Sequence, residues 1–98
     1  MLKQVQNGID FLNDSQVVPK DWYNKIDLDR LNMKSLGDCV LGQIRSMVDD
    51  EYFGTYEYDL GFDINDDYYY LNESDKPQAF NDLKETWRSE IEKLRSKD

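Results

Sequence analysis

The acidic middle of the chain contains closely spaced oxygen-bearing side chains that could bind Ca²⁺. Asp63, Asn65 and Asp67 fit positions 1, 3 and 5 of a calcium-binding loop. Position 6 of that loop requires a glycine for its sharp turn, but Tyr68 stands there. The bidentate glutamate belongs at position 12, and Glu73 is one residue early. We therefore expect no metal and no other cofactor.

Catalytic chemistry has few candidate residues in this chain. There is no histidine and one cysteine, Cys39, which excludes an ordinary zinc site and a catalytic triad. Cys39 falls on the apolar face of a predicted helix, where a buried thiol is usually inert. The many carboxylates could in principle act as acids and bases, but a crowd of exposed acids is no catalytic signature. We expect a protein that is not an enzyme.

The negative charge is concentrated in one region. The net charge is -9, and no lysine or arginine occurs between Arg45 and Lys76, a stretch that holds ten acidic residues. The rest of the chain has a net charge of +1. Direct binding to nucleic acid or to an anionic membrane is therefore not expected, because phosphate groups are bound by lysine and arginine.

Two interpretations of this acidic region remain open. It could be a solvated surface that keeps the protein soluble, or it could mimic nucleic acid. Side chains two residues apart on a strand lie about 6.6 to 6.8 Å from each other, so Glu57, Asp59 and Asp63 would form a row of negative charges on one face. Tyr69 would add a rigid anchor. The predicted partner-binding residues are Asp49, Asp50, Glu51, Glu57, Asp59, Asp63, Asp66, Asp67, Tyr69 and Glu73.

Apolar periodicity predicts three helices, at about 2–13, 36–48 and 77–95. The spacing of Ser35 and Asp38 resembles a capping box for the second helix. Gly8 should weaken the first helix by about 1 kcal/mol. The apolar residues expected to face the core are Leu2, Val5, Ile9 and Leu12 in the first helix, Leu36, Cys39, Val40, Ile44, Met47 and Val48 in the second, and Phe80, Leu83, Trp87, Ile91 and Leu94 in the third.

The pattern of the middle changes from helical spacing to alternation. Tyr56, Tyr58, Leu60, Phe62 and Ile64 alternate with polar residues or glycine, as in a strand with one buried face. This predicts a β-hairpin with arms at about 55–64 and 68–71, supported by the helices. Together with the helices, the fold class is α+β in a single domain, 1–98.

The sequence also predicts structural roles for Trp22 and Gly42. Trp22 should be a core anchor. Gly42, within the second predicted helix, should allow Trp22 or Trp87 to pack closely against it.

At Cys39-Val40-Leu41-Gly42-Gln43 the chain resembles a group of short, functionally uncharacterised proteins encoded by phages, prophages and some bacteria. The similarity covers most of the chain, from Trp22 to Ile91, and the five-residue segment is its distinctive part. The acidic, tyrosine-rich middle is longer here than in that group. The resemblance implies no activity and no catalytic residue. It implies a mobile-element setting, in which small acidic proteins often inhibit host enzymes, as uracil-DNA glycosylase inhibitors and anti-CRISPR proteins do.

The sequence therefore favours a stoichiometric inhibitor in the cytoplasm of a bacterial host cell. Its expected partner is a basic nucleic-acid-binding defence protein, with an RNA-guided CRISPR nuclease as the first candidate, because its nucleic-acid channels are positively charged. The alternative is a structural or regulatory module that binds a partner through its helices. No membrane association is expected, and no oligomeric state is predicted.

Overall fold

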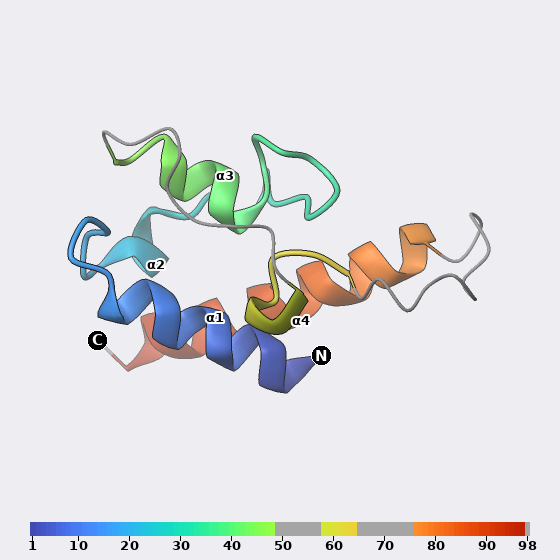
Figure 1. Cartoon of the computed structure of the whole chain (residues 1–98), viewed down its shortest axis with the longest axis horizontal. Coiled ribbons are helices and arrows are strands. Elements are labelled where there is room, and N and C mark those ends of the chain that lie inside the picture. Colours follow the sequence, from blue (N-terminus) through green and yellow to red (C-terminus); the bar gives the residue numbers. More distant parts are fainter. Residues whose placement is uncertain (49–57, 65–75, 98) are drawn as a thin grey trace.

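The computed structural model describes residues 1–48, 58–64 and 76–97, which form helices joined by loops (Figure 1). The helix α1 packs against the short 3-10 helix η1 and against α4, and α2 also packs on α4. In Figure 1, α3 lies above both α1 and α4. The elements are α1 (Leu2–Asp14), α2 (Trp22–Lys25), α3 (Val40–Arg45), η1 (Tyr58–Leu60) and α4 (Lys76–Ser96).

The predicted α+β fold is wrong, because no described residue lies in a strand. The alternating segment instead forms η1, and the amide of Gly61 closes it by donating to the carbonyl of Tyr58 at 2.9 Å. Gly61 then adopts a φ of +72°, which residues other than glycine rarely adopt. This turn reverses the chain where a strand would continue. Residues 55–57 of the first predicted arm, and the second arm at 68–71, lie outside the described residues.

The helices α1 and α4 confirm the predictions for 2–13 and 77–95. Their apolar faces are used in the core, where Val5, Leu12 and Trp87 are buried, although Leu2 at the start of α1 is half exposed. Arg95 near the end of α4 donates through Nε to the carbonyl of Tyr23, at 2.8 Å. This bond ties the last turn of α4 to the short helix α2.

The helix predicted at 36–48 is correct only for its central part, α3. The hydroxyl of Ser35 accepts from the amide of Asp38 at 3.2 Å, which is one of the two hydrogen bonds of a capping box. The Ser35 amide donates instead to the carbonyl of Asn32, at 3.0 Å. Cys39 then takes an extended conformation, with φ -72° and ψ 171°, so the helix begins only after it. Leu36 therefore lies outside the helix, and its side chain is 73% exposed rather than part of the apolar face. Met47 and Val48 follow the end of α3 and are half-buried against the core.

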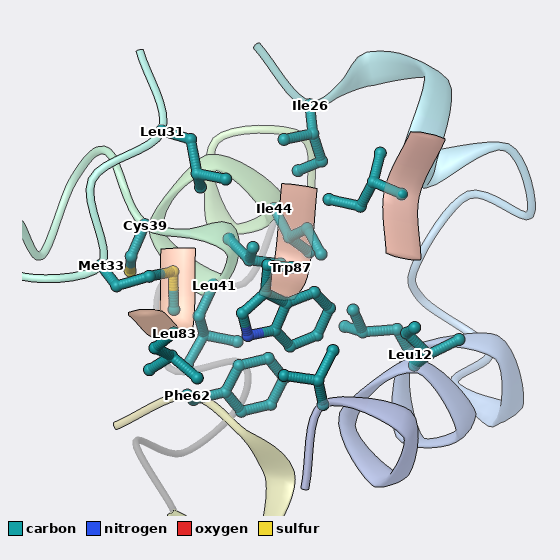
Figure 2. Close-up of a cluster of buried hydrophobic side chains, with 14 of the residues drawn as sticks. Leu12, Ile26, Leu31, Met33, Cys39, Leu41, Ile44, Phe62, Leu83 and Trp87 are labelled. Carbon is teal, nitrogen blue, oxygen red and sulfur yellow. The ribbon is translucent and has the colours of Figure 1, made fainter. Parts of the chain in front are cut away.

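Trp87 lies at the centre of one hydrophobic core that all four α-helices and the segment after η1 share (Figure 2). Its side chain has no exposed surface. The Phe62 ring stacks on it with centroids 5.6 Å apart, and Trp22 meets it edge-on at 6.5 Å. Both tryptophans are thus core residues, as predicted.

Two glycines allow α1 to approach η1 closely. A Cβ placed on Gly8 would lie 2.0 Å from the carbonyl oxygen of Leu60 and 3.0 Å from the Trp87 ring. A Cβ on Gly61 would lie 2.9 Å from the Cα of Val5. Gly8 is therefore needed for helix packing, and its cost to helix propensity is not its main effect.

Candidate functional site

The centre of the acidic region, residues 58–64, is attached firmly to the core. The indole Nε1 of Trp87 donates to the carbonyl of Gly61 at 2.6 Å in a buried hydrogen bond. Phe62 and Ile64 are both buried beside it. On the other side, the Asn7 side-chain amide donates to the carbonyl of Asp59 at 3.3 Å. We call residues 58–64 the anchored segment, because its backbone is held from both α4 and α1.

Two of the predicted partner-binding residues belong to this anchored segment. Asp59 is exposed, whereas Asp63 is half-buried and its carboxylate accepts from the Ile64 amide at 2.8 Å. Outside the described residues lie Asp49, Asp50, Glu51, Glu57, Asp66, Asp67, Tyr69 and Glu73.

The proposed row of charges on a strand is wrong for the part that the structure describes, because Asp59 lies in a 3-10 turn. Tyr58 was expected on the buried face and is only half-buried. Phe62 and Ile64, expected on the same face, are buried. The prediction that Phe62 and Ile64 are buried is thus correct, whereas the predicted strand is wrong.

The negative charge of the chain is concentrated, in sequence, on either side of the anchored segment. Residues 1–48, 58–64 and 76–97 contain twelve acidic and twelve basic side chains, and so are neutral overall. The other nine acidic residues, with no base among them, account for the whole net charge of -9. Eight of these nine flank the anchored segment in sequence, between residues 49 and 75.

Neither a metal-binding cluster nor a membrane span is found in the part of the chain that the structure describes. Within those ranges no three acidic, cysteine or histidine side chains are grouped so that they could hold a metal ion. None of the helices described is long and apolar enough to cross a membrane. The candidate calcium ligands Asn65 and Asp67 lie outside the described residues, so only Asp63 of that set can be placed.

A second candidate region is centred on Gln43, whose side chain is buried and makes three hydrogen bonds. Its Oε1 accepts from the amide of Asp27 at 2.7 Å, and its Nε2 donates to the carbonyl of Asp27 at 3.2 Å. Nε2 also donates to the carbonyl of Asp38 at 3.0 Å. Gln43 therefore fastens together the two ends of the loop from residue 27 to residue 38, which we call the clamped loop.

The other residues of the distinctive five-residue segment support the same loop. The Cys39 sulfur caps α3 by accepting from the Gly42 amide at 3.2 Å. A Cβ on Gly42 would lie 2.2 Å from the Leu36 carbonyl oxygen. Gly42 thus makes room for the backbone of the clamped loop, and the expectation that it makes room for a tryptophan is wrong. Sequence reasoning found the segment but missed this role.

Replacing Gln43 with leucine should destabilise the protein by about 1 to 3 kcal/mol, because it leaves the part-buried backbone groups of Asp27 and Asp38 without their partner. Urea denaturation would measure the loss. Gln16→Leu, at an exposed position that contributes nothing to the clamp, should change stability by no more than about 0.5 kcal/mol. Equal stabilities of the two variants would contradict the clamp.

Burial raises the pKa of the Cys39 thiol above its ordinary value, although the hydrogen bond from Gly42 partly opposes this. The folded state therefore favours the neutral thiol. The stability that comes from this preference is complete below the ordinary thiol pKa of about 8.5, and it is lost as the pH rises above that value. Melting curves should show a steeper alkaline decline for the wild-type protein than for Cys39→Ser, which has no thiol to ionise. Parallel declines would contradict this prediction.

No family model matches this chain, and neither a curated protein nor a solved structure matches it. Function is therefore inferred from the anchored segment and the distribution of charge.

Proposed function

We propose that this protein is a small acidic inhibitor that binds the basic nucleic-acid-binding surface of a host-defence protein. It acts by occupancy, without catalysis, in the cytoplasm of the bacterial host cell. An RNA-guided CRISPR nuclease is the first candidate target, because such nucleases bind nucleic acid in positively charged channels. The mobile-element setting implied by the segment Cys39–Gln43 supports this choice.

The observation that carries the proposal is the attachment of the acidic region to the core at its middle. A solvated surface that served solubility alone would need no buried hydrogen bond from Trp87 to Gly61 within it. The anchored segment presents Asp59 on a fixed backbone between the acidic stretches before and after it in sequence. Groups held in place before binding lose less entropy on binding, and this favours affinity.

The distribution of charge supports the same partner. Between Arg45 and Lys76 there are ten acidic and no basic residues, whereas the rest of the chain has a net charge of +1. Such a concentration attracts a basic groove, accelerates association and disfavours acidic partners. A diffuse excess of acid over the whole surface would give solubility without this selectivity.

The alternative, a module that binds through its helices, has less support. The apolar faces of α1 and α4 are occupied by the core, where Val5, Leu12, Leu83 and Ile91 are buried. Their outer faces carry mixed charge, such as the pair between Arg88 and Glu92 at 3.2 Å. Exposed ion pairs of this kind contribute little to stability.

Reversing the charge of Asp59 should test the proposal. Because Asp59 is exposed, Asp59→Lys should leave the fold intact and should weaken binding to a purified, guide-loaded nuclease by about tenfold or more, as the loss of a paired interfacial charge does. Asp21→Lys is the matched control, since Asp21 is an exposed acid that makes no side-chain cap on α2 and lies outside the acidic region. Binding would be measured by calorimetry. Equal affinity of the two variants would contradict the proposal.

A further inference from the structure

A groove of about 360 Å³ lies between the clamped loop and the first half of α4. Its helical wall is formed by Pro77, Phe80, Asn81 and Lys84, which share one face of α4 by their spacing. Residues 29–34 of the clamped loop form the opposite wall. In Figure 1 this loop, in teal and green, is on the same side of α4 as α3.

The groove is basic, in contrast to the chain as a whole. Its walls carry Arg30, Lys34 and Lys84 against one acid, Asp29. Arg30 is paired with Asp38 at 2.8 Å, just outside the groove lining. Lys34 and Lys84 form no ion pair with any residue in the described ranges, and they come from opposite walls. Two ammonium groups are therefore available to one anionic ligand.

The loop that forms one wall is fixed before any ligand binds. Gln43 closes its two ends, as described above. Within the loop, the Asn32 side chain accepts from the Lys34 amide at 3.0 Å, and the Asn32 amide donates to the Asp38 carbonyl at 3.2 Å. The side chains of Leu31 and Met33 are buried in the core. The backbone that carries Lys34 is thus held by both hydrogen bonds and packing.

The groove also offers apolar and amide groups beside its charges. Phe80 is half-buried and lines the groove, and Pro77 precedes it by one helical turn. Asn32 and Asn81 bring a side-chain amide to each wall. An inorganic anion would use only the lysines. A ligand that joins an aromatic ring to a phosphate would use every type of group present.

We propose that this groove binds a nucleoside phosphate. Lys34 and Lys84 contact the phosphate oxygens, because lysine recognises phosphate as a point charge. The base lies against Phe80, and the amides of Asn32 and Asn81 hydrogen-bond to its edge. The volume is within the range of small-molecule sites. This site is separate from the anchored segment, so it goes beyond the proposed inhibition and does not depend on it.

Nuclear magnetic resonance titration of the full chain would test the groove, with ADP, pyrophosphate and adenosine as the three probes. ADP should give saturable shifts at the amides of residues 29–34 and 78–84. Pyrophosphate, which lacks the base, should bind about fivefold or more weakly. Adenosine, which lacks the phosphates, should bind more weakly still. The absence of saturable shifts with ADP in the millimolar range would overturn the proposal, as would equal binding of ADP and pyrophosphate.

Lysine variants inside and outside the groove distinguish specific binding of ADP from general attraction of an anion to positive charge. Lys34→Gln and Lys84→Gln should each weaken ADP binding by about tenfold, as the loss of a charge-assisted contact does. Lys20→Gln removes the same charge from an exposed lysine that does not line the groove, and it should leave ADP binding unchanged. A loss for Lys20→Gln equal to that for the groove lysines would overturn the assignment. Melting temperatures of all three variants should remain near that of the wild type.

Discussion

Trp87→Ala should be the most destabilising single substitution in the described chain, with a loss of about 3 to 5 kcal/mol. Trp87 is fully buried, stacks on Phe62 and donates to the Gly61 carbonyl. A loss of this size approaches the whole stability of a small domain, which is about 5 to 15 kcal/mol. The variant should therefore be largely unfolded under mild conditions, as circular dichroism would show.

Trp87→Phe keeps the fold measurable and isolates the attachment of the anchored segment. It retains an aromatic ring but leaves the buried Gly61 carbonyl without its donor, at a cost of about 1 to 3 kcal/mol from that bond alone. Val17→Ala, at a position that is 54% exposed, should change the free energy of unfolding by no more than about 0.5 kcal/mol. If urea denaturation gave the two variants the same stability, the hydrogen bond from Trp87 to the Gly61 carbonyl would not be what holds the anchored segment.

Gly8→Ala should destabilise the protein by about 1 to 3 kcal/mol, the range for overpacked sites, although alanine is the better helix former by about 1 kcal/mol. The new methyl group would lie 2.0 Å from the Leu60 carbonyl oxygen, which is backbone and has no flexible end to move. Either η1 or α1 must therefore shift. Thermal and urea denaturation would measure the effect.

Gly37→Ala is the matched control, because a Cβ at Gly37 meets no atom within 4 Å. That substitution should be nearly neutral or slightly stabilising, since it restricts the unfolded chain. The opposite signs of the two glycine substitutions are the informative result. Stabilisation by Gly8→Ala would show that α1 and η1 are not in close contact.

The sequence predicts α1 and α4 well because an apolar residue every three or four positions is specific to a helix with one buried face. The same reasoning fails at residues 58–64, since alternation is also produced by a turn whose Phe62 and Ile64 point inward. Gly61 was the available signal, because a glycine inside a predicted strand often marks a bend. Its φ of +72° is the physical reason that the strand does not form.

The roles of Gly8 and Gln43 could not be predicted, because each depends on a partner distant in sequence, Leu60 for Gly8 and Asp27 for Gln43. Gly8 is required by the carbonyl of Leu60, and Gln43 binds backbone groups of Asp27 and Asp38. Helix propensity describes only the local chain, so it assigned Gly8 a cost and missed its packing role. Of the candidate site, the concentration of acidic residues is visible in the sequence, whereas the hydrogen bond from Trp87 to the Gly61 carbonyl is visible only in the fold.

Competition with DNA is the most direct test of the proposed function. A guide-loaded CRISPR nuclease would be titrated with this protein in the presence of labelled target DNA, at several salt concentrations. The account predicts mutually exclusive binding of protein and DNA, with an affinity for the protein that falls steeply as salt rises. A ternary complex of nuclease, DNA and this protein, or binding that does not change with salt, would contradict it.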